Sequence, residues 1–337
     1  MQKNISKKLN EFRSELSESY PSLLLKYPLQ KYIMEIQAYR KYHSYHYVSP
    51  KLIRIFDDIV MEFSVCALAL YHKLALCTFI LDTLKHLNSK NTPKRINELY
   101  HEWFERVVRD LSIQPDSYYH HSTYPFLDDV AICSRRAIPV GGAWLVDPQF
   151  LINKYHNSAY RSGVKKKPKA EPDKEKLRMI VKNLLLRLGL LKGVRFLQVI
   201  SRQCGLYYVI HTADRYLPGF TEQYMNQAYI NIAELLKADR KFCGIYRRSW
   251  FLDPNLKKIN PGLRFLWEVP SQNGAKLFCA GSSEKIILRA LKKSPLRKRL
   301  YEEGKYIPMN YAYIWPREKL LQWAEGMVLS KNIKGHK

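Results

Sequence analysis

The sequence predicts an α+β protein in which a helical N-terminal region is followed by a mixed α/β domain with a layered sheet. Two observations carry this prediction. Apolar residues recur at helical spacing through residues 1–112. Between residues 195 and 316, short runs rich in Val, Ile, Tyr and Phe alternate with helical segments, as expected where strands and helices share one domain.

The N-terminal region, residues 1–112, is predicted to be a small helical bundle. Ser49 and Pro50 combine an N-cap side chain with a proline at the first helical position, which is typical of a helix start. Apolar residues then recur at intervals of three and four, so each helix can bury one face against its neighbours. The predicted helices cover residues 9–16, 27–42 and 50–87, and a further helix begins near residue 92.

One apolar run, residues 59–81, is long enough to raise the question of a membrane span. Glu62, His72 and Lys73 interrupt it, and ionisable side chains are costly inside a bilayer. The run therefore predicts a buried core helix, and no transmembrane segment is expected. Residues 1–20 alternate charges and lack the apolar core of a secretory signal. The expected location is cytoplasmic.

Residues 113–161 are predicted to be an irregular connection with some β structure. His120 and His121 lie next to each other, so on a regular element their side chains diverge. The chain has six cysteines, but none has the Cys or His spacing that zinc requires. No metal site is predicted, and the cysteines are expected to be reduced and mostly buried.

Two similar runs, residues 143–150 and 249–256, each join a Trp-containing apolar stretch to an Asp-Pro pair. Proline lacks the N–H that a strand ladder needs, and aspartate favours turns. Asp147-Pro148 and Asp253-Pro254 are therefore both expected to end a strand.

Residues 162–176 are dense in Lys and Pro and nearly free of apolar side chains. This composition predicts a basic flexible linker between the N-terminal part and an α/β domain over residues 177–330. A basic amphipathic helix over residues 175–191 is expected to lead into that domain.

The C-terminal domain is predicted to contain a hairpin, several further strands and the helices between them. Thr221 is the expected N-cap of its first long helix. The predicted strands are residues 196–200, 206–211, 242–246, 263–269, 276–280 and 311–315, and the predicted helices are residues 221–237, 283–291 and 296–303.

The chain is strongly basic. Lys and Arg number 56 against 30 acidic residues, which gives a formal charge of +26. A field of this sign attracts polyanions and phosphorylated ligands, including nucleic acid and anionic lipid headgroups. A generally basic solvated surface is the alternative explanation.

Familiar nucleotide and hydrolase signatures are missing, because the sequence contains no GxGxxG after a strand, no GxxxxGK[ST], no GxSxG and no HExxH. His211 is the residue with the best position for chemistry, since it ends a predicted strand and precedes Asp214. A neutral imidazole there is a candidate general base. The alternative is a histidine that hydrogen-bonds its own loop.

Basic residues in the same domain are candidates for binding a phosphorylated cofactor. Arg247 and Arg248 lie at the end of a predicted strand, and Lys292 and Lys293 follow a predicted helix. Lys and Arg both suit phosphate.

Asp253 comes shortly after the arginine pair and has two competing explanations. It either caps the Asp-Pro turn while Trp250 fills the core, or acts on a substrate bound against the indole.

The segment Leu300-Tyr301-Glu302-Glu303-Gly304-Lys305-Tyr306, followed by the predicted strand 311–315, resembles the closing segment of GNAT-type acyltransferases. The resemblance implies a GNAT-like sheet, acyl-CoA as the donor and Tyr301 as the acid that protonates the leaving thiolate. The pyrophosphate-binding motif of that superfamily is absent, since residues 202–205 match only its first half. The sequence therefore predicts an acyltransferase-like enzyme with His211, Asp253 and Tyr301 as catalytic candidates.

The alternative function is binding of nucleic acid without catalysis. It rests on the net charge, on the interleaved basic and aromatic residues 39–47, and on the Lys- and Arg-rich segment 292–299.

Overall fold

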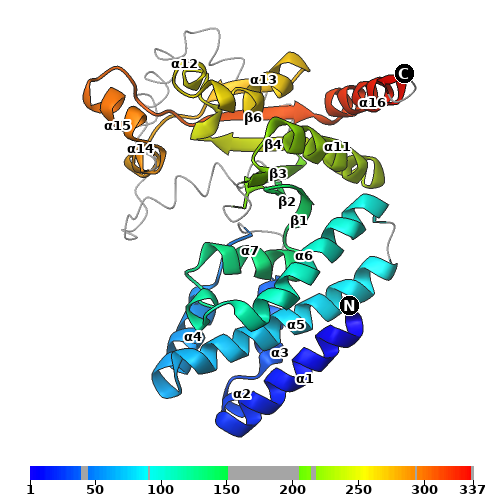
Figure 1. The fold of residues 1–337 in the computed structure, drawn as a ribbon, viewed down its shortest axis with the longest axis vertical. Coiled ribbons are helices and arrows are strands. Elements are labelled where there is room, and N and C mark those ends of the chain that lie inside the picture. The colour runs from blue at the N-terminus through cyan, green and yellow to red at the C-terminus, as the bar shows by residue number, and fades with distance from the viewer. Residues whose placement is uncertain (39–44, 90–91, 151–204, 214–217, 293, 335–337) are drawn as a thin grey trace, which may run out of the picture.

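The structure is a computed structural model of the 337-residue chain, and it describes residues 1–38, 45–89, 92–150, 205–213, 218–292 and 294–334. The predicted α+β class is confirmed: helices α1–α7 come first, and a mixed six-stranded sheet with interleaved helices follows (Figure 1). The predicted linker 162–176, helix 175–191 and strand 196–200 lie outside the described residues.

The N-terminal helices pack around α5, which contacts α1, α3, α4, α6 and α7. Ser49 caps α4 as predicted, because its hydroxyl accepts from the Leu52 N–H at 3.1 Å. The elements are α1 (Gln2–Ser19), α2 (Leu23–Lys26), α3 (Leu29–Ala38), α4 (Pro50–Glu62), α5 (Val65–Ser89), α6 (Lys94–Ile113), η2 (Asp116–Tyr118) and α7 (Tyr124–Cys133).

Two helix predictions in this region are wrong. The continuous helix over residues 50–87 breaks after Glu62, because the Ser64 hydroxyl accepts from the Ala67 N–H at 3.0 Å and so caps a second helix. Residues 113–161, predicted to be an irregular connection with some β structure, contain two strands but also the unpredicted helix α7, which begins with Pro125 in its first turn.

Helix α5 is apolar enough, by length and composition alone, to cross a membrane over Val65–Leu87. Its most apolar window is 67% buried inside the structure. That burial favours a core helix, as its contacts with five surrounding helices also do.

The sheet has the strand order β1-β2-β3-β4-β6-β5. Among the described strands, only β3 and β4 pair in parallel, and the helix α11 (Glu222–Ala238) connects them. All other neighbours are antiparallel. The strands are β1 (Ile138–Gly141), β2 (Trp144–Phe150), β3 (Leu206–Thr212), β4 (Phe242–Ser249), β5 (Lys276–Cys279) and β6 (Tyr311–Pro316).

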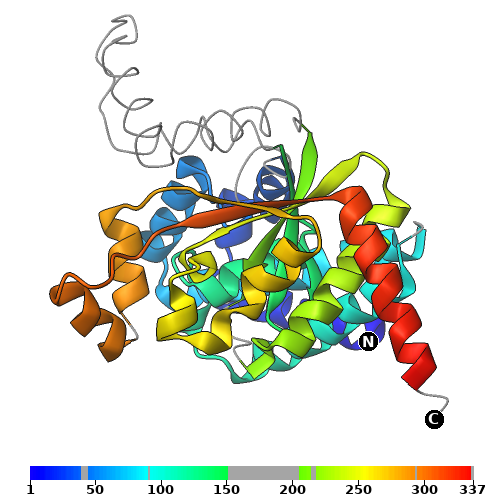
Figure 2. The same ribbon diagram turned by 90° about the horizontal axis from the view of Figure 1, so that it is seen from above.

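One face of the sheet is covered by α11, α13 (Phe265–Gln272) and α16 (Arg317–Lys334) (Figure 2). Trp315 on β6 contacts Tyr229 of α11 and Trp323 of α16, and its indole N–H donates to the Asn273 carbonyl after α13 at 2.9 Å. The opposite face carries a separate small apolar cluster, formed by Tyr207, Val209, Tyr246, Ala312 and Ile314.

Residues 263–269 were predicted to be a strand and are mostly helix α13 instead. A short apolar run rich in aromatic residues suits either element by composition, and here the residues contribute a helical face with Phe265 and Leu266 buried. The remaining elements between β4 and β6 are η4 (Trp250–Leu252), α12 (Leu256–Ile259), η5 (Pro261–Leu263), α14 (Glu284–Leu291) and α15 (Pro295–Glu302).

The prediction that Asp147-Pro148 ends a strand is wrong, since β2 continues to Phe150. The Ala213 N–H donates to the Ala143 carbonyl, so Ala143 and every second residue after it on β2 direct their N–H and C=O groups towards β3. Pro148 is not one of these residues. Pro148 therefore faces the β1 side, where the ladder stops at Val146. The missing N–H costs no hydrogen bond.

The turn between β1 and β2 lies against the start of α11. Gly142 has φ +57°, and a Cβ added to it would lie 2.9 Å from the Gly219 carbonyl oxygen and 2.9 Å from the Tyr224 Cβ. Glycine is required here both by the backbone conformation and by the close approach.

We expect Gly142→Ala to destabilise the protein by about 1–3 kcal/mol from backbone strain alone, with the steric contact adding to it. Gly262→Ala is the matched control, because nothing lies within 4 Å of its added Cβ. Chemical unfolding of both variants tests this expectation. Equal stabilities would contradict it.

Candidate functional site

His211 and Asp147 form a hydrogen-bonded pair across β3 and β2. The His211 Nε2 and Asp147 Oδ1 atoms are 2.6 Å apart, and the second carboxylate oxygen accepts from the Gln149 side chain. The side chain of Asp147 is 3% exposed and that of His211 is 21% exposed. A buried carboxylate therefore holds an imidazole that reaches the surface.

The strand register explains this pair. Leu145 lies opposite His211 and Asp147 lies opposite Val209, so the two side chains are diagonal neighbours on the same face. An imidazole oriented by a carboxylate is the arrangement by which histidine acts as a general base. The sequence identified His211 but expected Asp214 as its neighbour, and Asp214 lies outside the described residues.

A second pair of the same kind lies nearby. The His46 Nε2 atom is 2.6 Å from the Asp128 Oδ1 atom, and burial raises the pKa of Asp128 in spite of this contact. The ring of Tyr45 lies 3.9 Å from that of His46 and 4.4 Å from that of His211, measured between centroids. Tyr45 thus connects the two pairs.

Tyr45 and His46 belong to the segment 39–47, whose interleaved basic and aromatic residues predict binding of nucleic acid. Residues 39–44 are outside the described residues. Tyr45 is 5% exposed and His46 faces Asp128, so these two rings are packed inward.

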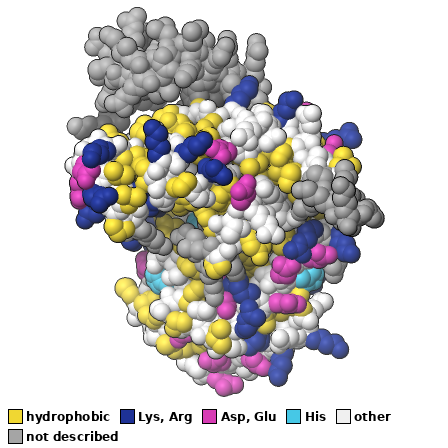
Figure 3. Space-filling model, turned by 45° about the horizontal axis from the view of Figure 1, so that its top comes forward, with side chains coloured by type: hydrophobic (Ala, Val, Ile, Leu, Met, Phe, Trp, Pro, Cys, Tyr) yellow, Lys and Arg dark blue, Asp and Glu magenta, His cyan; other side chains and the backbone are white. Residues whose placement is uncertain are grey.

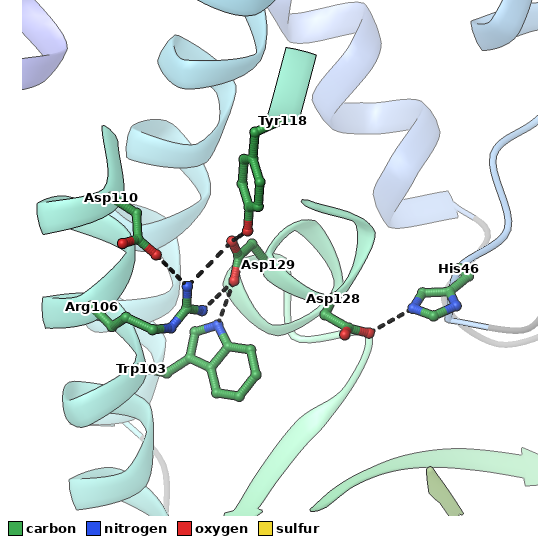
Figure 4. Close-up of polar contacts among 7 residues, drawn as sticks. All are labelled: His46, Trp103, Arg106, Asp110, Tyr118, Asp128 and Asp129. Carbon is green, nitrogen blue, oxygen red and sulfur yellow. Dashed lines mark hydrogen bonds and ion pairs between the residues drawn. The ribbon is translucent and has the colours of Figure 1, made fainter. Parts of the chain in front are cut away.

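Asp128 is held in place by its neighbour Asp129 (Figure 4). Asp129 accepts from the Trp103 Nε1–H at 3.0 Å, from the Tyr118 hydroxyl at 2.5 Å and from the Arg106 guanidinium. Arg106 also donates to Asp110 at 2.8 Å. Consecutive helical residues point about 100° apart. Anchoring Asp129 to α6 therefore directs Asp128 towards His46.

Burial alone would lower the pKa of Arg106, yet the charge of Asp129 raises it overall. This guanidinium is thus an internal cation whose charge is balanced by Asp110 and Asp129. In the described part of the chain, no group of three or more His, Cys, Asp or Glu side chains is arranged to hold a metal ion.

The parallel ladder of the sheet ends beside His211. The last pair between β3 and β4 among the described residues is Val209 with Tyr246. Beyond it, β3 stays paired with β2 to Thr212, and β4 stays paired with β6 to Ser249. The two central strands therefore part at the position where His211 projects.

The backbone on β3 continues to present hydrogen-bonding groups past this point. The Ala213 N–H donates to the Ala143 carbonyl at 2.9 Å, which fixes Ala213 and His211 as the residues that bond to β2. The N–H and C=O groups of Ile210 and Thr212 point the other way, towards the β4 side.

The predicted phosphate contacts lie on different surfaces. Arg247 is 2% exposed and faces the α11 side, whereas Arg248 is exposed and donates to the Ala280 carbonyl at 3.3 Å on the other side. Lys292 is exposed at the end of α14, and Lys293 lies outside the described residues.

Asp253 is completely buried. Its two oxygens accept from the Asn255 N–H at 2.9 Å and from the Met309 N–H at 3.4 Å, while burial raises its pKa. Residues 250–252 before it form a 3₁₀ helix rather than the expected strand. Tyr301, by contrast, is 38% exposed on α15.

Of the cysteines expected to be buried, Cys77 and Cys133 are buried, Cys279 is half-buried, and Cys66 and Cys243 are exposed.

Comparisons of the chain with protein-family models, with curated proteins and with solved structures found no match.

The double contact of Asp253 leads to a prediction. Asn at this position keeps one oxygen and replaces the other with an NH₂ donor, so either Asn255 or Met309 loses its acceptor. We expect Asp253→Asn to lower the free energy of unfolding by about 1–3 kcal/mol.

Asp239→Asn is the matched control, because Asp239 also accepts from the N–H two residues on, that of Lys241 at 3.0 Å. Asn at position 239 still has one oxygen to accept that hydrogen bond, so the substitution should leave stability nearly unchanged. Urea unfolding at neutral pH compares the two variants. Wild-type stability of Asp253→Asn together with lost ligand binding would favour a direct role in function.

Proposed function

We propose that the protein is an acyltransferase that uses an anionic phosphorylated donor such as acyl-CoA, with His211 as its general base. The observation that carries the proposal is the His211–Asp147 pair beside the end of the β3–β4 ladder. A base, an orienting carboxylate and open backbone groups then lie within one stretch of the sheet.

In the proposed reaction, an amine or hydroxyl acceptor attacks the carbonyl carbon of the thioester. His211 takes the proton of the acceptor as the new acyl bond forms, and the carbon–sulfur bond breaks. Asp147 stabilises the imidazolium that results. The thiolate leaves with a proton from an acid, for which the resemblance to GNAT-type enzymes implies Tyr301.

The donor is expected to lie along β3 where β4 no longer pairs with it. An extended chain that carries amide groups can add to an open strand edge through backbone hydrogen bonds. Beyond the last β3–β4 pair, the C=O of Ile210 and the N–H and C=O of Thr212 point to that side, whereas the Ile210 N–H is used in pairing with Tyr246. The exposed Arg248 and Lys292 are the described basic residues that remain candidates for the phosphates.

Removing the base tests the proposal. We expect His211→Gln to slow thiol release from acyl-CoA by about 10²–10⁴-fold, because the acceptor keeps its proton. We expect Asp147→Asn to reduce the rate as well, since Asn does not stabilise the imidazolium. Thiol release is measured over a panel of amine and hydroxyl acceptors, with His101→Gln as the control.

Donor binding is measured separately by thermal shift. A CoA thioester at about a hundred times its Kd should stabilise wild type by about 2.7 kcal/mol. His211→Gln should keep this stabilisation. A folded wild-type protein that no CoA species stabilises would remove the proposal.

The second candidate function is binding of nucleic acid, favoured by the +26 charge and by the exposed basic residues of α14 and α15. Arg297, predicted as part of that surface, is 6% exposed. Its Nε–H donates to the Ala290 carbonyl at 2.7 Å and its guanidinium lies over the Trp250 ring. It therefore holds the two helices together, which leaves Lys292, Lys298 and Arg299 for phosphates.

If this function holds, replacing Lys292, Lys298 and Arg299 with Gln should flatten the log–log dependence of duplex affinity on salt by about 0.9 for each lost phosphate contact. Lys3, Lys7 and Arg13, exposed on α1, are the matched control set. Filter binding across a salt series measures both. The same slope for the two triple variants would contradict a role for α14 and α15.

A further inference from the structure

Arg247 is a buried cation that has no anionic partner among the described residues. Its side chain contacts the Met225 sulfur, with Nη1 and Sδ 3.6 Å apart, and its guanidinium lies 4.6 Å from the centre of the Trp144 ring. Within the described ranges, no carboxylate lies at ion-pair distance from it. A buried charge that lacks a counter-charge costs several kcal/mol, so this arrangement needs an explanation.

Arg106 shows how the same chain treats another buried arginine. It is 9% exposed and forms ion pairs with both Asp110 and Asp129. Arg247 is 2% exposed, more deeply buried than Arg106, and has a thioether and an aromatic face where Arg106 has two carboxylates.

The surroundings of Arg247 also contain a second donor without an acceptor. Trp144 is completely buried, and its Nε1–H has no hydrogen-bond partner in the part of the chain that the structure describes. Its ring contacts both the Arg247 guanidinium and the ring of Phe220, whose centroid is 4.8 Å away. An indole N–H can only donate. The cluster thus offers a guanidinium and an N–H together.

Two tyrosine hydroxyls complete the cluster. Tyr229 and Tyr313 hydrogen-bond to each other at 3.0 Å, and burial raises the pKa of both. The positive charge of Arg247 and its side-chain hydrogen bonds to the two hydroxyls oppose that rise. Both hydroxyls are consequently neutral at physiological pH and do not balance the charge of the guanidinium.

The cluster lies where the central strands part. Arg247 is the first residue of β4 after the last ladder pair, Val209 with Tyr246, and Trp144 lies opposite Thr212 at the same end of β3. Both side chains are on the face covered by α11, since Arg247 contacts Met225 in the first turn of that helix.

We propose that Arg247 and Trp144 bind the carboxylate group of a small ligand or substrate. The planar fork of a guanidinium matches the two oxygens of a carboxylate, and the indole N–H supplies a further donor to one of them. Bound carboxylate supplies the missing counter-charge. This binding does not depend on acyl transfer, so it can be tested by itself.

The experiment follows the melting temperature of the full chain as sodium formate or acetate replaces sodium chloride at constant ionic strength. Wild type is expected to show a saturable rise in melting temperature. Arg247→Met removes the charge but keeps the apolar stem, and should abolish the rise. Arg240→Met makes the same change at an exposed position and should keep it.

Trp144→Phe provides a second variant that retains an aromatic ring and the charge of Arg247. We expect it to weaken carboxylate binding about fivefold to tenfold, the effect of losing one hydrogen bond. ¹³C-formate line broadening in NMR measures that affinity directly, also if Arg247→Met fails to fold.

The proposal is overturned if wild type shows no saturable response to either carboxylate, or if Arg247→Met responds as wild type does. An equal rise with sulfate at the same ionic strength would also overturn it, because it would show a general anion effect. An unchanged affinity in Trp144→Phe would remove Trp144 from the site.

Discussion

The parting of β3 and β4 after Val209 and Tyr246 sets the surroundings of both His211 and Arg247 in the described part of the sheet. Parallel strands are normally bonded along their shared length, and here each continues with its outer neighbour alone. Side chains alternate between the two faces along each strand. Just beyond the last pair, His211 on β3 therefore lies on one face of the sheet and Arg247 on β4 lies on the other. The end of β3–β4 pairing thus lies next to His211 on one face and next to Arg247 on the other.

The buried arginines Arg106, in the helical part, and Arg247, in the sheet, have different surroundings. In the helical part, Asp129 gathers the Arg106, Trp103 and Tyr118 donors and so ties α6 to α7 (Figure 4). In this network the guanidinium charge is balanced by two carboxylates, which orient the side chains around it. In the sheet, Arg247 has no carboxylate partner among the described residues, and the Trp144 Nε1–H beside it has no acceptor there. The carboxylate proposed for this place would supply both.

The order and type of the main elements could be predicted from the sequence, since they follow from local periodicity. The Ser49 cap of α4 and the Thr221 cap of α11 are found where they were expected. Prediction from local pattern was wrong for α13, because its composition suits a strand as well as a helix. It was also wrong at Ser64, whose side chain caps a new helix inside an apolar run.

The partners of the site could not be predicted, because they come from strand register. His211 and Asp147 are 64 residues apart, and His46 and Asp128 are 82 apart, so no local spacing signals either pair. The Asp-Pro pattern did single out Asp147, but as a strand end. A carboxylate inside an otherwise apolar strand was the available signal for its role, and its pairing with His211 depends on β2 and β3 being neighbours.

The distribution of charge separates long-range attraction from local recognition. Among the described residues, the buried charged side chains are four arginines, Arg106, Arg136, Arg247 and Arg297, and five aspartates, Asp110, Asp128, Asp129, Asp147 and Asp253, a net of 4 − 5 = −1. The interior thus contributes none of the +26, and the visible face in Figure 3 carries Lys and Arg side chains widely spread. Surface charge acts through solvent and is screened by salt over about 10 Å at 0.1 M. Arg247, enclosed in the sheet, is screened much less, so attraction of a polyanion and recognition of a single carboxylate should respond to salt in different ways.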